Sequence, residues 1–259
     1  MNDKPGTKPD ITSTITPTPE AAAQTLRLSW NHERRNQLLN RWSVRLMRVT
    51  VFGATGAIGK LLVTHLLAGG DEVTAYVRPT TKIPAGWTNK VRVVVGLITD
   101  ATAIDRAIEG AEAVASALGP DMNRQATGLP LVTGTQLILE SMKRHGVGRY
   151  VGNGTPSVLD ARDKATFQTR FTTFVARKLL PRAHEEMAGM SKQVMTSGLD
   201  WTIVRFFAPK DGAAKGVRRV GFFGSARIGF GVTRDDIAKF TADQIHDPTY
   251  SRAAPAISN

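Results

Sequence analysis

Three glycines beside an apolar run carry the clearest chemical signal in this sequence. Gly53, Gly56 and Gly59 stand in "VFGATGAIGKLLV", between a strand-like segment and a segment with helical periodicity. The first glycine permits a sharp exit from a strand, the second lets the backbone approach a ligand, and the third lets a helix pack closely on a sheet. This combination suits the binding of a phosphate at the amino end of a helix.

The spacing of these glycines is G-x-x-G-x-x-G, not the commoner G-x-G-x-x-G, so a tight corner without a ligand is the alternative. Their place at the first strand-to-helix junction favours a ligand, because a doubly wound sheet exposes the amino end of its first helix there. The N–H groups around Thr55, Ala57 and Ile58 then face an anion. We predict a dinucleotide site that contains these three residues and the three glycines.

The end of the second predicted strand indicates which dinucleotide is bound. NAD-binding units usually place an acidic residue there to take the ribose hydroxyls. This chain reads "AYVRPTTK", with Arg78 at that place and no carboxylate near it. A guanidinium favours a 2′-phosphate through a bidentate contact, and Thr80, Thr81 and Lys82 add donors. The sequence favours NADP(H) over NAD(H); the alternative is a solvent-facing arginine.

The sequence lacks the residues that several other kinds of functional site require. The chain has no cysteine, which removes disulfides, thiolate metal ligands and a cysteine nucleophile. No H-x-x-x-H pair and no G-x-S-x-G elbow occurs, so we predict neither a metal site nor a serine hydrolase. The five histidines are scattered along the chain: His32, His65, His145, His184 and His246.

Alternating strand and helix patterns from Met47 onward would position the glycine corner. Strands are predicted at 48–54, 71–78, 91–98, 111–118, 148–153 and 200–207. Helices are predicted at 59–70, 100–110, 129–147, 168–197 with an interruption near Pro181, and 233–245. This alternation predicts an α/β fold: a single Rossmann-like, doubly wound parallel sheet with helices on both faces. We assign 47–259 to this domain, including C-terminal elements that form a substrate pocket.

The first 46 residues differ from the rest of the chain. Residues 1–26 hold almost no large apolar side chains and are predicted to be disordered. Residues 27–46 combine leucines, Trp42 and arginines, and this pattern predicts a short basic amphipathic helix that lies on the domain, a partner or a membrane surface. The alternative is a dangling extension, with Met47 as the working start.

The net charge of +12 is large for 259 residues. It suits nucleic acid, an anionic membrane surface or a phosphorylated ligand, whereas scattered surface charge is the simpler interpretation. Because few of the cations cluster with aromatic residues, we predict no specific nucleic-acid partner. No apolar run approaches the roughly 18–20 residues of a transmembrane helix. We expect a cytoplasmic protein acting on a small molecule, of undetermined oligomeric state.

Further segments resemble a known family. "YVRP", "VASALGP", "RHGVGRYV", "SGLDWTIVR" and "VTRDDIAKF" follow the glycine run in the expected order. The chain from Met47 to its end resembles the atypical short-chain dehydrogenase/reductases of the NAD(P)H-binding, NmrA-like type, including small reductases similar to the flavin/biliverdin reductase B type. These motifs are specific for the fold and the coenzyme and leave the substrate open.

The resemblance implies roles for the residues that follow each strand. Ala117, Leu118 and Gly119 would pass beneath the adenosine, and Asn153 and Gly154 would border the nicotinamide together with Thr155. Phe206, Phe207 and Ala208 would wall the nicotinamide and substrate space. Gly53, Thr55, Gly56, Ala57, Ile58 and Arg78 would contact the coenzyme.

The chain departs from the family pattern in two places. Gly96-Leu97 stands where members often have Gly-Asp, so that only backbone and an apolar wall, with Leu97, would meet the adenine. None of the three tyrosines has a lysine four residues on, and the positions of the catalytic Tyr-x-x-x-Lys pair fall near Ala183 and Met187. Proton transfer through a tyrosinate of that kind is therefore excluded.

Two residues remain as candidates for catalysis. His184 lies one residue from the missing tyrosine position and can donate a proton near neutral pH; a surface histidine is the alternative. Thr155 aligns with the serine that polarises a carbonyl in ordinary members, against a loop-capping role. A bound water is a third source of the proton. Asp160 and Asp163 are expected to be solvated loop carboxylates.

The segment "FQTRFTTFVARKLLP" spaces Phe167, Phe171, Phe174 and Leu179 at helical intervals. It predicts a lid over an apolar substrate or a subunit interface, with a core-facing helix as the alternative.

These observations together predict an NADP(H)-dependent oxidoreductase. It would transfer hydride to a small apolar or aromatic acceptor, such as a quinone, flavin, enone or carbonyl, without a Tyr-x-x-x-Lys dyad. One alternative is a non-catalytic NADP(H)-binding redox sensor that acts through a protein partner. Another is a nonredox isomerase or cyclase on the same fold.

Overall fold

The structure, a computed structural model, describes residues 46–121, 127–165, 171, 174 and 177–259. The predicted 1–46 extension therefore lies outside the described residues except for Leu46. The elements are β1 (Arg48–Phe52), α2 (Ala57–Ala68), β2 (Glu72–Val77), η1 (Ala85–Trp87), β3 (Val91–Val95), α3 (Ala101–Ile108), β4 (Ala113–Ser116), α4 (Pro130–Arg144), β5 (Arg149–Gly154), α6 (Pro181–Met195), β6 (Asp200–Arg205), β7 (Ala208–Lys210), β8 (Arg219–Gly221), β9 (Gly231–Thr233), α7 (Arg234–His246), η2 (Pro248–Tyr250) and β10 (Ala256–Ser258).

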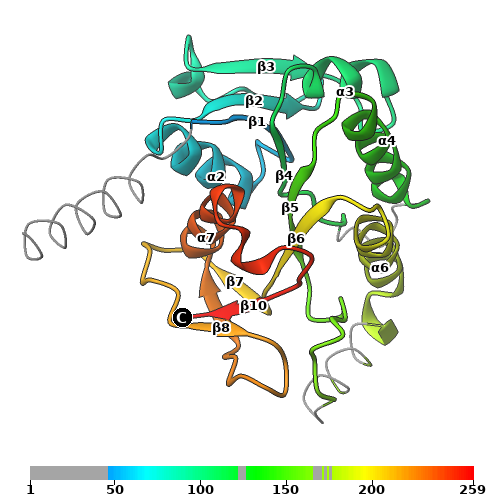
Figure 1. Ribbon diagram of the computed structural model, residues 1–259, viewed down its shortest axis with the longest axis vertical. Helices are drawn as coiled ribbons and strands as arrows, with labels where there is room; N and C mark the ends of the chain where they lie inside the picture. The colour runs from blue at the N-terminus through cyan, green and yellow to red at the C-terminus, as the bar shows by residue number, and fades with distance from the viewer. Residues whose placement is uncertain (1–45, 122–126, 166–170, 172–173, 175–176) are drawn as a thin grey trace, which may run out of the picture. The chain divides into compact units, whose positions relative to one another are not determined.

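An eight-stranded sheet in the order β3-β2-β1-β4-β5-β6-β10-β8 forms the centre of the domain (Figure 1). Its first seven strands run parallel, as predicted, and their central members are short β-branched and apolar runs that are buried on both faces. The prediction of a doubly wound α/β fold is confirmed.

Each face of the sheet carries its own core. Val49 and Val51 of β1 belong to a buried cluster with residues of α2 and α7, whereas Phe52 belongs to a cluster on the opposite face. This alternation follows from the two-residue repeat of a strand. In Figure 1, α2 and α7 lie together on one side of the sheet, and α3, α4 and α6 cover the other.

The start of the last long helix was predicted correctly from sequence. The Thr233 hydroxyl accepts a hydrogen bond from the Asp236 backbone N–H at 3.1 Å, which satisfies one free donor of the first turn of α7. Ile237 and Ile245 are buried, whereas Phe240 is half-buried.

Four short strands were missed, and one of them corrects the parallel-sheet prediction. β7 to β10 hold three residues each, too few to produce a periodic pattern. They exist through long-range pairing: Ala256 of β10 lies beside Arg205 of β6, and β8 runs antiparallel to β10. β7 and β9 pair in a separate small sheet. The main sheet therefore contains one antiparallel pair, between β10 and the edge strand β8.

The strand order places a switch point between β1 and β4. From β1 the chain proceeds outward to β2 and β3, then returns to β4 on the other side of β1. The loops after β1 and β4 therefore diverge at the carboxyl edge of the sheet. In open α/β sheets this is where a ligand crevice forms.

A polar cluster joins α3 to α4 on the outer face. Asp105 accepts hydrogen bonds from Arg144 at 2.7 Å and from the Ser141 hydroxyl at 2.9 Å, and His145 lies 3.2 Å away. The hydrogen bonds from Arg144, Ser141 and His145 lower the pKa of Asp105 from 3.8 to about 2.

We predict that Asp105→Asn reduces stability at neutral pH by about 1 kcal/mol, because the pair is partly exposed. A carboxylate whose pKa is lowered in the folded state stabilises the fold above its unfolded pKa. The difference between the two proteins should therefore be complete above pH 3.8 and disappear as the pH falls through about 2. Urea denaturation of both proteins across this range measures it, and a difference that stays constant with pH contradicts the assignment.

Candidate coenzyme-binding site

A cavity of about 690 Å³ opens at the carboxyl edge of the sheet, at the switch point. Residues from the loops after β1, β2, β3 and β4 line it, with the amino end of α4 and two side chains of α6. The structure brings eight of the predicted coenzyme residues together on its wall: Gly53, Thr55, Gly56, Arg78, Leu97, Ala117, Leu118 and Gly119. These eight predicted residues therefore share one surface.

Close backbone approach explains the first and third glycines of the corner. Gly53 has φ +72°, and a Cβ there would lie 2.8 Å from the carbonyl carbon of Ala117 after β4. A Cβ on Gly59 would overlap the carbonyl oxygen of Gly53. Only glycine at both positions lets the first turn of α2 sit against the loop that follows β1.

The middle glycine keeps one wall of the cavity open. Gly56 has φ −68°, and a Cβ there would meet only the Gly53 carbonyl oxygen, at 3.2 Å. It is the N-cap of α2, with no side-chain cap and no acidic residue in the first turn. The first N–H groups of the helix are therefore left for an anion. Ala57 and Ile58 begin this turn beside the cavity and are not on its wall.

Among the residues that line the cavity from the loops after β2 and β3, only Arg78 is charged. The Tyr76 hydroxyl donates to the Leu97 carbonyl at 2.6 Å, and burial raises the pKa of Tyr76 to about 12, which keeps the phenol protonated. Gly96 has no room for a side chain because the Tyr76 ring lies against it. The exposed Leu97 side chain then forms the apolar wall expected where the family often has a carboxylate.

Arg78 follows β2 directly and lies on the cavity wall. It is exposed, and within the described part of the chain no hydrogen bond or ion pair holds its guanidinium. A charged group with five donors and no partner at a cavity edge is suited to an anionic ligand.

Sequence reasoning missed the pair Arg182 and Glu186. Both line the cavity from α6, four residues apart on one helix face. Glu186 is 1% exposed and accepts a hydrogen bond from the Leu131 N–H at 2.9 Å, so it caps the amino end of α4 from a neighbouring helix. The sequence shows the i, i+4 spacing of these opposite charges, but it does not show that both side chains face the cavity.

Arg182 fastens the loop between β4 and α4. Its guanidinium donates to the carbonyl oxygens of Asp121 and Gly128 and lies 3.5 Å from the Glu186 carboxylate. Both carbonyls belong to the described ends of a segment whose middle, 122–126, lies outside the described residues. The pair therefore holds the part of the cavity wall formed by this loop and the start of α4.

The predicted catalytic residues do not line this cavity. Thr155 is half-buried, and its hydroxyl lies 2.6 Å from that of Ser157 in the turn after β5, as a loop-capping threonine would. His184 is half-exposed, two residues along α6 from Arg182 and therefore on a different side of the helix. Its buried Nδ1 has no hydrogen-bond partner among the described residues.

The two predicted nicotinamide neighbours in β5 also lie off the cavity wall. The Asn153 side chain accepts a hydrogen bond from Thr241 of α7 at 3.1 Å. Gly154 is buried against Ile203 and leaves no room for a side chain. Ala183 and Met187, the positions of the family dyad, carry no titratable group, and Met187 is a core residue.

The three residues after β6 that were expected to form a substrate wall differ in their burial. Phe206 is buried in the core beside α2 and α7, whereas Phe207 is half-buried and Ala208 is exposed. The Phe207 ring lies 5.3 Å from that of Phe223 and 5.1 Å from that of Phe230. An aromatic cluster thus joins segments that are distant in sequence.

The cluster rests on a buried ion pair, which corrects the expectation for Asp163. Arg205 is fully buried at the end of β6, pairs with Asp163 at 2.6 Å and lies over the Phe223 ring. Burial raises the pKa of Asp163, but the hydrogen bonds from Arg205 and from backbone N–H groups outweigh this and lower it. Asp160 is buried and Asp163 is half-buried, and both carboxylates anchor a loop that was expected to be solvated.

The predicted lid segment is only partly described. Phe171, Phe174 and Leu179 are exposed, which contradicts the core-facing alternative for these three side chains. Phe167 lies outside the described residues.

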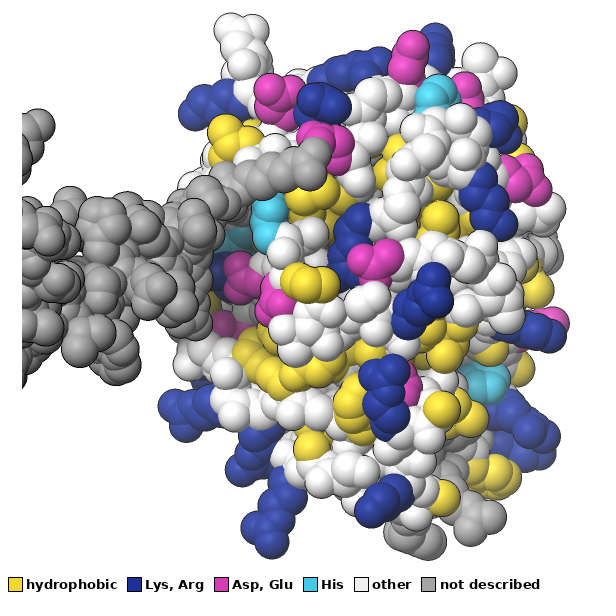
Figure 2. All heavy atoms as spheres, viewed as in Figure 1, with side chains coloured by type: hydrophobic (Ala, Val, Ile, Leu, Met, Phe, Trp, Pro, Cys, Tyr) yellow, Lys and Arg dark blue, Asp and Glu magenta, His cyan; other side chains and the backbone are white. Residues whose placement is uncertain are grey.

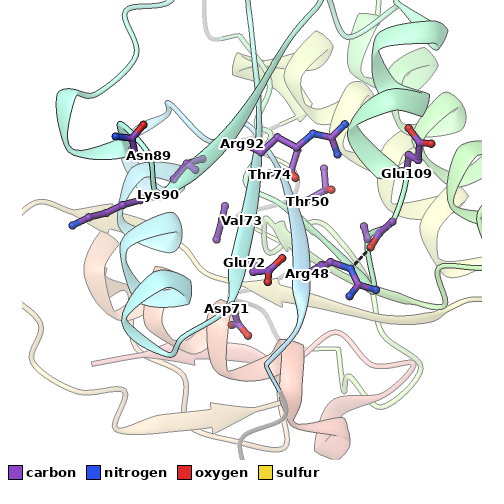
Figure 3. Close-up of a pocket in the computed structure, with 13 residues that line it drawn as sticks. Arg48, Thr50, Asp71, Glu72, Val73, Thr74, Asn89, Lys90, Arg92 and Glu109 are labelled. Carbon is purple, nitrogen blue, oxygen red and sulfur yellow. Dashed lines mark hydrogen bonds between the residues drawn. The ribbon is translucent and has the colours of Figure 1, made fainter.

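A second hollow of about 540 Å³ lies at the amino ends of β1, β2 and β3, the opposite edge of the sheet (Figure 3). Three of its charged side chains are engaged within the protein. Arg48 donates to the Gly110 carbonyl, Arg92 to the Arg106 carbonyl, and the buried Asp71 accepts from the Met47 N–H. It therefore lacks the uncapped helix and the free guanidinium of the first cavity.

The described parts of the chain contain no group of three or more His, Cys, Asp or Glu side chains placed to hold a metal ion. None of their helices combines the length and the apolar character needed to cross a membrane.

The family profile described as NAD(P)H-binding matches residues 53–248. The chain belongs to this family. The expected membership of an NAD(P)H-binding family is confirmed. The oxidoreductase activity remains a prediction. The preference for NADP(H) remains a prediction.

Curated relatives match over part of their length. A 3-beta-hydroxysteroid dehydrogenase of Mycolicibacterium neoaurum is 27% identical over 177 residues, which are 60% of this chain and 48% of that protein. An uncharacterised protein of Mycobacterium tuberculosis is 32% identical over 105 residues, 40% of this chain and 12% of that protein. The chain thus spans about half of one relative and about an eighth of the other.

Solved structures share the fold. A short-chain dehydrogenase/reductase from Veillonella parvula aligns with a TM-score of 0.67 at 18% identity, covering 83% of this chain and 94% of that one. A wide-type form from the same organism, in complex with NADP, gives 0.66 at 18% identity, with 82% and 94% covered. The anaerobillin reductase ChuY from Escherichia coli gives 0.64 at 19% identity, with 81% and 96% covered.

We predict opposite consequences for alanine at two glycines of the corner. Gly59→Ala should lower the free energy of unfolding by about 3 kcal/mol, because the new methyl overlaps backbone that cannot move away. Gly56→Ala should change it by less than about 1 kcal/mol, since its φ is ordinary and only one atom is near. Urea denaturation of both variants tests this. Equal stabilities would show that close helix approach does not constrain the corner.

Proposed function

We propose that this protein is an NADP(H)-dependent oxidoreductase that transfers hydride to a small apolar or aromatic acceptor, such as a quinone, flavin, enone or carbonyl, without a Tyr-x-x-x-Lys dyad. The observation that carries the coenzyme choice is the unpaired Arg78 at the end of β2. An NAD-specific site would place a carboxylate there for the ribose hydroxyls. Arg78 supplies instead two parallel donors for a 2′-phosphate.

The cavity fits the coenzyme on its own geometry. The missing side chain of Gly56 leaves room for a pyrophosphate against the uncapped amino end of α2. Leu97, Ala117 and Leu118 offer apolar and backbone surface for the adenosine half. When bound, the nicotinamide supplies the hydride, and the protein orients it and excludes water.

Arg182 and Glu186 act as positioning residues in this proposal. Glu186 fixes the amino end of α4, and Arg182 fixes the loop after β4, so this part of the cavity wall keeps its place. The charge of Arg182 also offsets the buried carboxylate, which would otherwise oppose an anionic coenzyme in the same cavity.

The proton for the acceptor is assigned to Thr155, His184 or a water they hold. Thr155 follows β5 at the edge that the coenzyme would reach, and its hydroxyl can both donate and accept. His184 carries an unpartnered buried nitrogen on α6. Phe207, a member of the aromatic cluster, and the adjacent Ala208 are proposed to meet the acceptor, which suits a planar apolar molecule.

A non-catalytic redox sensor is the second candidate. The absence of titratable groups at Ala183 and Met187 favours it, because the usual proton donor of the fold is missing. A nonredox isomerase or cyclase uses the same coenzyme site, and no described contact favours it.

We predict that Arg78→Ala weakens NADPH binding about 10- to 100-fold, as expected for loss of a charge-assisted bidentate contact, and leaves NADH binding nearly unchanged. Isothermal calorimetry with both coenzymes measures this. Lys143→Ala removes the same charge from an exposed site on α4, and its NADPH affinity should stay near that of the wild type. Equal losses for NADPH and NADH in the Arg78 variant would contradict the phosphate assignment.

We expect NADPH oxidation when purified full-length protein is mixed with a panel of quinones, flavins, enones and carbonyls. The decrease in absorbance of the reduced nicotinamide reports turnover. If the protein binds NADPH tightly but turns over none of the acceptors, the redox-sensor hypothesis is favoured. If calorimetry detects no binding of any nicotinamide coenzyme, both the oxidoreductase and the sensor hypotheses are overturned.

A further inference from the structure

Positive charge gathers in the C-terminal segment 206–234. Six Lys or Arg residues and a single acid give this stretch a net charge of +5, and Asp211, the acid, pairs with Arg234 at 2.6 Å. The other five cations are exposed, and none is held in an ion pair among the described residues: Lys210, Lys215, Arg218, Arg219 and Arg227. Their charge is therefore free to meet an anionic partner.

An exposed aromatic ring lies between two of these cations. Phe230 is 60% exposed although its ring lies 5.1 Å from that of Phe207. On one side, the Arg219 guanidinium reaches the neighbouring Gly229, and on the other, the Lys210 side chain lies over Gly231. We call Phe207, Lys210, Arg219 and Phe230 the Phe230 patch.

The patch is built on paired strands. The Ala208 N–H donates to the Phe230 carbonyl at 3.0 Å, where β7 meets β9, and Arg219 stands in β8 beside β10. Its cations and its ring are thus held together by backbone pairing. In the view of Figure 2, Lys and Arg side chains project from the lower part of the molecule, where Figure 1 places β8, with few acidic side chains among them.

We propose that the Phe230 patch docks the protein on an anionic phospholipid surface. A lone exposed aromatic side chain between free cations is suited to the membrane interface, where the ring enters the headgroup boundary and the cations meet lipid phosphates. A nucleic acid would favour several stacked aromatic positions along a basic groove, and the described surface offers one exposed ring here. This inference does not depend on the proposed oxidoreductase activity.

Vesicle sedimentation tests the proposal with the full-length protein. The wild type should sediment with vesicles of phosphatidylcholine and phosphatidylglycerol and not with phosphatidylcholine alone, and added salt should release it. Lys210→Gln/Arg219→Gln should lower the vesicle–water partition coefficient about 25-fold, because each lost cation should lower it about fivefold. Phe230→Ser should lower it roughly tenfold through loss of apolar burial.

The matched control is Lys90→Gln/Lys143→Gln. It removes the same charge from two exposed positions, one directly before β3 and one on α4. It should retain vesicle binding to within a few-fold. Equal losses in the two double variants would assign binding to diffuse charge and overturn the proposal. Failure of the wild type to sediment, or preferential capture of duplex DNA over vesicles, would overturn it as well.

Coenzyme calorimetry on the same variants separates docking from folding and from the proposed function. Unchanged NADPH binding by the patch variants shows that their lost sedimentation is not misfolding. A protein that binds vesicles and gives no heat with a nicotinamide coenzyme would remove the proposed function and leave the docking surface in place.

Discussion

The candidate site depends on how closely the first turn of α2 approaches the loop after β1. That approach leaves no space for a Cβ on Gly59, and the loop itself needs the positive φ of Gly53 against the backbone after β4. Three backbone segments therefore meet without side chains between them. Because of this contact, the uncapped end of α2 faces the crevice at the switch point, where its free N–H groups can serve an anion.

Around this corner, the cavity is shaped by groups that keep one another in place. The Tyr76 phenol stays protonated and holds the Leu97 carbonyl, while Glu186 caps α4 and Arg182 fastens the neighbouring loop. The hydrogen bonds of these polar groups stabilise the cavity wall, so the groups are not free to bind a ligand. Arg78 is different, since its charge has no partner among the described residues and faces the cavity. The free guanidinium of Arg78 and the uncapped end of α2 distinguish this cavity from the hollow at the opposite edge.

A second organising contact lies at the C-terminal end of the sheet. The fully buried Arg205, paired with Asp163 and stacked on Phe223, ties the loop after β5 to the strands that follow β6. A buried charge is costly unless it is paired and hydrogen-bonded, so this arrangement specifies one placement of these loops. The aromatic cluster and the exposed Phe230 are positioned by it and by the short strands beside it.

The sequence alone determined the parts that rest on local pattern. The periodicity of the apolar residues predicted the parallel strands and the helices. The glycine spacing and the strand end predicted Gly53, Thr55, Gly56 and Arg78, which share one cavity wall, whereas the resemblance to a family supplied the other four predicted residues of that wall. These signals are local because backbone conformation, helix caps and strand ends depend on neighbouring residues. Thr233 at the start of α7 is a clear example.

Only the tertiary structure decided what distant segments do to one another. The three-residue strands β7 to β10 exist through pairing partners far along the chain, and Asp163 is engaged because Arg205 comes to it from β6. Sequence adjacency placed His184 next to the missing tyrosine position, yet the pitch of α6 turns Arg182 and Glu186 to the cavity instead. Side-chain surroundings depend on packing between elements, and no local pattern encodes that packing.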